Sequence, residues 1–66
     1  MINVDEEWVR GQRGFRILGN DDYGYVVRAC GNHKNLSDPD SPLKTLEEAR
    51  NWLTYFYPGT KLVDTQ

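Results

Sequence analysis

Several features that would narrow the function of a small protein are missing from this sequence. Its 66 residues include a single cysteine, Cys30, so the chain cannot form an internal disulfide, on which small secreted domains usually rely. No apolar run approaches the roughly 18 residues of a membrane span. The opening stretch, MINVDEEWVR, carries acids where a signal peptide has bases. We therefore expect a cytoplasmic protein in which residues 1–66 form one small domain.

Signatures of catalysis and metal binding are also missing. The sequence contains no GxxxxGK[ST] phosphate loop, no GxSxG nucleophile motif and no HExxH zinc motif. Cys30 and His33 supply only part of the ligand set of a structural zinc site, and they lack the third group and oxyanion hole of a cysteine nucleophile. Asp38 and Asp40 lack the glycine and terminal glutamate of a calcium loop. We expect neither an enzyme nor a bound cofactor.

A strong charge of either sign is absent as well. Ten acids and eight bases leave a net charge of −2, which does not favour a strongly electrostatic nucleic-acid binder. The charges are nevertheless unevenly placed, since several arginines lie in the first half of the chain. The acids form clusters that we expect mostly at strand ends, in loops and at the start of a helix: Asp5-Glu6-Glu7, Asp21-Asp22, Asp38/Asp40 and Glu47-Glu48.

Alternating apolar residues predict a β-hairpin in the first half of the chain. Residues 14–18, GFRIL, place Phe15 and Ile17 on one face, and residues 23–30, YGYVVRAC, alternate in the same way. The glycines, asparagine and aspartates between the two runs suit a turn, because they tolerate positive φ or bond to the backbone. The sequence therefore predicts two antiparallel strands with one apolar face.

The segments around this hairpin are less regular. A short strand around residues 8–10 can precede it, and Leu62 and Val63 can form a last strand. The polar segment 31–44 contains two prolines and is long for a connection within a compact domain. It contains either a short edge strand near residues 33–36 or a functional loop.

The clearest element is a helix over residues 46–57, within LKTLEEARNWLTYFYPG. Thr45 and Glu48 match the T-x-x-E capping box, and the following Pro-Gly ends the helix. At about 100° per residue, one apolar arc carries the residues that we expect to pack on the sheet: Leu46, Ala49, Trp52, Leu53, Phe56 and Tyr57. Tyr55 lies on the polar face, where packing does not explain it. The sequence thus predicts an α+β fold, a small antiparallel sheet of about two to four strands with one helix across one face.

Acids beside aromatic residues suggest docking on a basic protein surface, because rings supply contact energy and acids supply orientation. In size, acidity and lack of catalytic motifs, the chain resembles small phage-encoded inhibitors, including anti-CRISPR proteins. That resemblance implies a larger intracellular partner with a nucleic-acid-binding surface. The exposed aromatics we expect beside acids are Trp8, Tyr23 and Tyr55. The candidate partner-binding residues are Glu6, Glu7, Asp21, Asp22, Glu47, Glu48 and Tyr55.

The arginines of the hairpin favour an alternative, a sheet face that binds DNA. If the apolar positions face the helix, Arg16 and Arg28 stand on the opposite, exposed face, with Arg10 and Arg13 as flanking phosphate contacts. The stretches YGYVVRACGN and LKTLEEARNWL resemble, in their apolar and turn positions, the AP2-like arm-binding domain at the N-terminus of phage and mobile-element integrases. This resemblance implies a sheet face lying in the DNA major groove. The small number of bases predicts weak binding.

Overall fold

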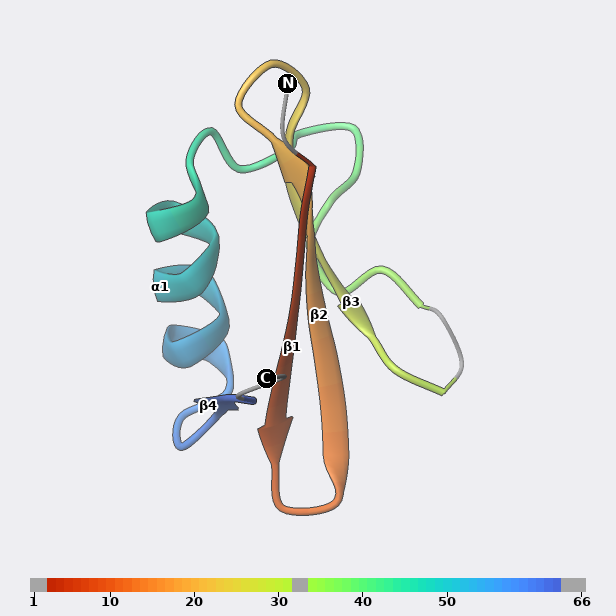
Figure 1. Ribbon diagram of the computed structural model, residues 1–66, viewed down its shortest axis with the longest axis vertical. Coiled ribbons are helices and arrows are strands. Elements are labelled where there is room, and N and C mark those ends of the chain that lie inside the picture. The colour runs from red at the N-terminus through yellow and green to blue at the C-terminus, as the bar shows by residue number, and fades with distance from the viewer. Residues whose placement is uncertain (1–2, 32–33, 64–66) are drawn as a thin grey trace.

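The protein, described here by a computed structural model, folds into an antiparallel sheet with one helix across one face (Figure 1). The structure describes residues 3–31 and 34–63. The elements are β1 (Val4–Arg10), β2 (Arg13–Asn20), β3 (Gly24–Ala29), α1 (Leu46–Phe56) and β4 (Lys61–Leu62). The four strands lie in the order β3-β2-β1-β4, so the predicted α+β class is confirmed. The last strand begins one residue earlier than predicted.

The predicted hairpin corresponds to β2 and β3, joined by a turn at residues 21–23. Its register pairs Ile17 with Val27, and both side chains are fully buried beneath α1. Beside the turn, Gly19 has a φ of +145°, and a Cβ at this position would lie 2.1 Å from the carbonyl oxygen of Gly24. The close approach of the two strands therefore requires glycine at position 19.

β1 is longer than the short strand predicted from the sequence, since it spans seven residues. Its acids lie within the strand, which corrects their predicted place at a strand end. Asp and Glu are poor strand formers, but each of these acids forms an ion pair with an arginine. Asp5 and Glu7 form ion pairs with Arg16 on the neighbouring strand, and Glu6 forms one with Arg50 of α1. These pairs offset the low strand propensity.

The core lies between the sheet and α1. Its buried side chains come from three strands and the helix: Trp8, Phe15, Ile17, Tyr25, Val27, Ala49 and Leu53. The prediction that Trp8 is an exposed aromatic is wrong, because only 8% of this residue is accessible to solvent. The strand alternation of β1 directs Trp8 toward the helix, and its neighbour Glu7 toward the other face.

α1 begins and ends close to the predicted positions. The Thr45 hydroxyl accepts a 3.1 Å hydrogen bond from the Glu48 amide, which caps the first turn. The chain leaves the helical conformation at Tyr57, whose ring packs on Phe15 at a centroid distance of 4.9 Å. Tyr57 thereby covers the sheet next to the helix end. Phe56 is 56% exposed, so the prediction that it packs in the core is wrong.

The long connection after β3 lies along the outer edge of that strand. Tyr25 and Leu43 exchange backbone hydrogen bonds of 2.7 and 2.9 Å, and the Leu36 amide donates to the Val27 carbonyl at 2.8 Å. The described part of the connection forms isolated bridges and no named strand. It covers an edge that would otherwise be open to pairing with another chain. Residues 32–33, which include part of the predicted edge strand, lie outside the described residues.

Candidate binding surfaces

The sheet face turned away from α1 carries two of the arginines expected there. The cross-strand neighbours Glu7, Arg16 and Arg28 form one row over β1, β2 and β3. Arg16 donates to Asp5 at 2.8 Å and lies 3.7 Å from Glu7, and the hydrogen bond to Asp5 raises the pKa of Arg16 above its ordinary value. We call Asp5, Glu7, Arg16 and Arg28 the open-face charge cluster. Its acids oppose the positive potential that attracts DNA phosphates.

The other two arginines of the predicted DNA-binding set lie elsewhere. Arg10 and Arg13 pair with each other at the tip of the β1–β2 hairpin. Arg13 lines a pocket on the helix side of the sheet, together with Phe15 and Tyr57. Because partners in register place their side chains on the same side of a sheet, Arg10 also belongs to the helix side. The structure therefore does not bring the four predicted arginines onto one face.

The predicted partner-binding acids are also spread over several surfaces, and Glu6 is the most enclosed of those in β1. Arg50 donates through Nε to Glu6 Oε1 at 3.0 Å, and the Trp8 indole donates to the same oxygen at 3.2 Å. The hydrogen bonds from Arg50 lower the pKa of Glu6 below its ordinary value of 4.5. Glu6 therefore joins the helix to the sheet, whereas its neighbour Glu7 belongs to the open-face charge cluster.

A second group of predicted acids gathers at one end of the molecule. Asp21 and Asp22 lie in the β2–β3 turn, at the same end as the first turn of α1, which carries Glu47 and Glu48 (Figure 1). Asp21 accepts a 2.7 Å hydrogen bond from the Tyr25 hydroxyl, which raises the pKa of Tyr25. All four acids are exposed. The tip of the β1–β2 hairpin, with its two arginines, lies at the opposite end.

The outer face of α1 carries a cluster of exposed aromatic rings. Tyr55 is 78% exposed, as the sequence predicts, and Phe56 is the exposed ring beside it. Half-buried Trp52 packs on Phe56 at a centroid distance of 4.7 Å, and Tyr55 meets Phe56 edge-on at 4.9 Å. An open groove of about 340 Å³ passes over these rings. We call it the outer helix groove, and its lining is Leu43, Glu48, Asn51, Trp52, Tyr55 and Phe56.

Four members of this groove were not predicted from the sequence as contacts with a partner: Leu43, Asn51, Trp52 and Phe56. The spacing of Trp52, Tyr55 and Phe56 is the signal that points to the two missed rings, because residues three and four apart are neighbours on a helix surface. The spacing does not reveal which edge of an aromatic stripe meets the sheet. In this fold the smaller residues Ala49 and Leu53 take the contact.

Metal-binding chemistry finds no support in the part of the chain that the structure describes. No group of three or more His, Cys, Asp or Glu side chains within residues 3–31 and 34–63 could hold a metal ion. Cys30 is exposed, and its predicted neighbour His33 lies outside the described residues.

Within the described ranges, no helix has the length and apolar character needed to cross a membrane. No protein-family model, curated protein or solved structure matches the sequence or the fold.

Proposed function

We propose that this chain is a non-enzymatic binding protein that docks on a basic surface of a larger protein through the outer helix groove. The observation that carries the proposal is the ring cluster of exposed Tyr55 and Phe56 with half-buried Trp52. Aromatic side chains bury much apolar area on association and are enriched in binding hot spots. Because Ala49 and Leu53 already close the helix against the sheet, the outer rings remain available to a partner.

The charge around the groove favours a basic partner. Glu48 is one of the groove residues, and Glu47 stands beside it in the first turn of α1, whose last turn has no basic residue. Asp21 and Asp22 lie at the same end of the molecule. Acids at the rim of an interface speed the encounter with a basic surface and orient it, while the apolar centre supplies most of the affinity.

Basic protein surfaces commonly bind nucleic-acid phosphates. A protein that occupies such a surface competes with the nucleic acid and thereby inhibits the nucleic-acid-binding protein. This is the role that the resemblance to small phage-encoded inhibitors, including anti-CRISPR proteins, implies. We therefore propose inhibition by competition as the consequence of docking.

The alternative, DNA binding by the sheet face, has weaker support. In the open-face charge cluster Asp5 and Glu7 balance Arg16 and Arg28, so the cluster carries no net positive charge. Fluorescence anisotropy of labelled duplex DNA tests this alternative directly. Binding that weakens log-linearly with salt concentration would favour the sheet face over the helix.

Capture of the partner with matched variants tests the proposal. The immobilised protein is exposed to a lysate of the cell in which it is expressed, and the retained proteins are identified by mass spectrometry. We expect a nucleic-acid-binding protein that is retained by the unmodified protein, lost with Tyr55→Ala and with Glu48→Lys, and released by added nucleic acid. Leu62→Ala is the control, because Leu62 is an exposed apolar residue of β4, outside the groove and beyond the other end of α1 from Glu47 and Glu48.

The opposite pattern would contradict the proposal. Retention that survives Tyr55→Ala and Glu48→Lys but is lost with Arg28→Ala would assign the working surface to the open face of the sheet. Lys44, next to the helix cap, offers a further check. Lys44→Glu makes this end more acidic and should strengthen retention, whereas weaker retention would argue against a basic partner.

A further inference from the structure

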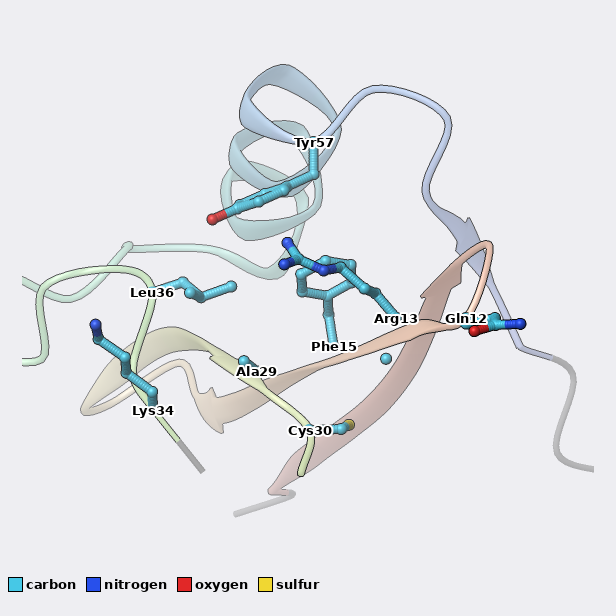
Figure 2. Close-up of a pocket in the computed structure, with 9 residues that line it drawn as sticks. Gln12, Arg13, Phe15, Ala29, Cys30, Lys34, Leu36 and Tyr57 are labelled. Carbon is cyan, nitrogen blue, oxygen red and sulfur yellow. The ribbon is translucent and has the colours of Figure 1, made fainter. Parts of the chain in front are cut away.

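A pocket opens on the helix side of the sheet, beside the C-terminal end of α1 (Figure 2). Its volume is about 320 Å³, at the lower end of the range of small-molecule sites. Segments far apart in the sequence build it: the β1–β2 hairpin, the end of β3, the connection after β3 and the residue that follows α1. The lining residues that matter here are Arg13, Phe15, Ala29, Lys34, Leu36 and Tyr57. None of them belongs to the outer helix groove.

The inner wall of this pocket is apolar. Ala29, Leu36 and Tyr57 are half-buried, so each retains surface that a ligand can cover, and Phe15 is almost fully buried among them. The rings of Phe15 and Tyr57 contact each other at a tilt of 41°. A ligand can therefore contact the edges of these rings but cannot insert between them. An apolar group of a ligand would therefore lie against this wall and leave water.

The rim of the pocket is cationic. Arg13 and Lys34 are both lining residues, and no aspartate or glutamate is among the lining residues that the structure describes. In Figure 2 the side chain of Arg13 extends from β2 toward Phe15 and Tyr57, whereas the side chain of Lys34 points away from Arg13. The guanidinium of Arg13 can donate two parallel hydrogen bonds to one carboxylate.

The acids of β1 do not neutralise Arg13 as they neutralise Arg16. Asp5 and Glu7 lie on the open face of the sheet, whereas Arg13 lines a pocket on the helix side. Glu6 does point to the helix side, but it is held by Arg50. Arg13 therefore keeps a positive field over an apolar wall, which is the arrangement that selects an anion with an apolar body.

We propose that this pocket binds a small organic carboxylate, with the carboxylate at Arg13 and the apolar body against Ala29, Leu36 and Tyr57. The site is separate from the outer helix groove, so it adds a small-molecule ligand to a protein that docks through its helix. The carboxylate forms charge-assisted hydrogen bonds at the rim, and the apolar body covers the half-buried wall.

Titration with benzoate, followed in amide NMR spectra of the isotope-labelled protein, tests this site. We expect saturable shifts centred on Gly14, Ala29, Leu36 and Tyr57, with a dissociation constant in the millimolar range or tighter. Benzamide, which has the same shape without the charge, should bind about tenfold more weakly, because the charge-assisted bonds are lost. Inorganic phosphate, which lacks an apolar body, should also bind more weakly than benzoate.

Two variants separate the site from a general effect of charge. Arg13→Gln should weaken benzoate binding about tenfold. Arg10 is the cross-strand partner of Arg13 but does not line the pocket, so Arg10→Gln should change benzoate binding by less than about twofold. Ala29→Leu fills the pocket without changing its charge and should abolish binding. Tyr55→Ala, in the outer helix groove, should leave benzoate binding unchanged even if it abolishes capture of a protein partner.

Several results would overturn the assignment. The absence of saturable shifts at the pocket amides would do so at once. Equal binding of benzamide or of phosphate would show that the charge or the apolar wall has no role. An equal loss in Arg10→Gln and Arg13→Gln would reduce the effect to the net charge of the hairpin tip.

Discussion

The open face of the sheet and the outer face of α1 are both exposed, yet they differ in what they offer a ligand. On the sheet, Arg16 is already paired with Asp5 and Glu7, so a ligand must displace carboxylates of the same chain. On the helix, most of the surface of the Tyr55 and Phe56 rings contacts water, so a ligand that covers them mainly displaces water. Exposed ion pairs contribute little net free energy, whereas removal of aromatic surface from water drives association. This difference favours the helix as the docking surface, although the arginines are more conspicuous in the sequence.

The largest expected effect separates the inner and outer faces of α1. Leu53→Ala removes a fully buried side chain and should lower the free energy of unfolding by about 2–5 kcal/mol. Phe56→Ala removes a ring that is mostly in solvent and should lower it by less than about 1 kcal/mol. Urea denaturation followed by tryptophan fluorescence measures both. Similar losses in the two variants would mean that Phe56 belongs to the core after all.

The next effect concerns binding at nearly constant stability. Tyr55→Ala should weaken the complex with the captured partner by about 2 kcal/mol, or roughly 30-fold in dissociation constant, as expected for a central aromatic contact. Its free energy of unfolding should stay within about 0.5 kcal/mol of the unmodified protein. Calorimetry on the complex and urea denaturation of the free protein measure the two quantities. If Tyr55→Ala were as unstable as Leu53→Ala, Tyr55 would be part of the core, and the two faces of α1 would not differ in their role.

An intermediate effect is expected for the ion pair that joins the helix to the sheet. The Glu6 side chain is 16% exposed and Arg50 is 42% exposed, so the pair is only partly screened by water. Glu6→Gln should lower the free energy of unfolding by about 1–2 kcal/mol at neutral pH. Because folding lowers the pKa of Glu6 below 4.5, the unfolded chain binds more protons between the two pKa values.

The pH dependence gives the sign of this effect. The stabilisation by Glu6 is fully present above a pH of about 4.5 and is lost as the pH falls through the lower pKa of the folded state. Thermal unfolding of Glu6→Gln should therefore change less with pH across this acidic window than that of the unmodified protein. Parallel pH profiles for the two proteins would show that the Arg50 contact does not act through the charge of Glu6.

The smallest effect is expected on the open face. Arg16→Gln breaks an ion pair whose side chains are 43% and 55% exposed, and it should change the free energy of unfolding by less than about 1 kcal/mol. It should also leave capture of the partner unchanged. Urea denaturation and the capture assay measure these outcomes. A strong loss of capture in Arg16→Gln, with stability preserved, would reverse the ranking of the two surfaces.

The sequence by itself determined the β2–β3 hairpin and the helix of this fold. The alternation around Ile17 and Val27 is a period of two that produces strands, and the glycines and aspartates between them permit the turn. Thr45 and the apolar spacing that follows define the helix and its cap. These signals are local, because each depends on residues within a few positions, and they were enough to predict the α+β class and the exposure of Tyr55.

The tertiary structure alone decided which surfaces are available. Arg16 and Asp5 lie 11 residues apart, and Arg50 and Glu6 lie 44 apart, so their pairing depends on strand register and on the position of α1. The same packing turns Trp8 inward and leaves Phe56 outside. A local pattern shows that a residue is charged or aromatic, but only contacts between distant segments decide whether its partner lies within the chain or outside it.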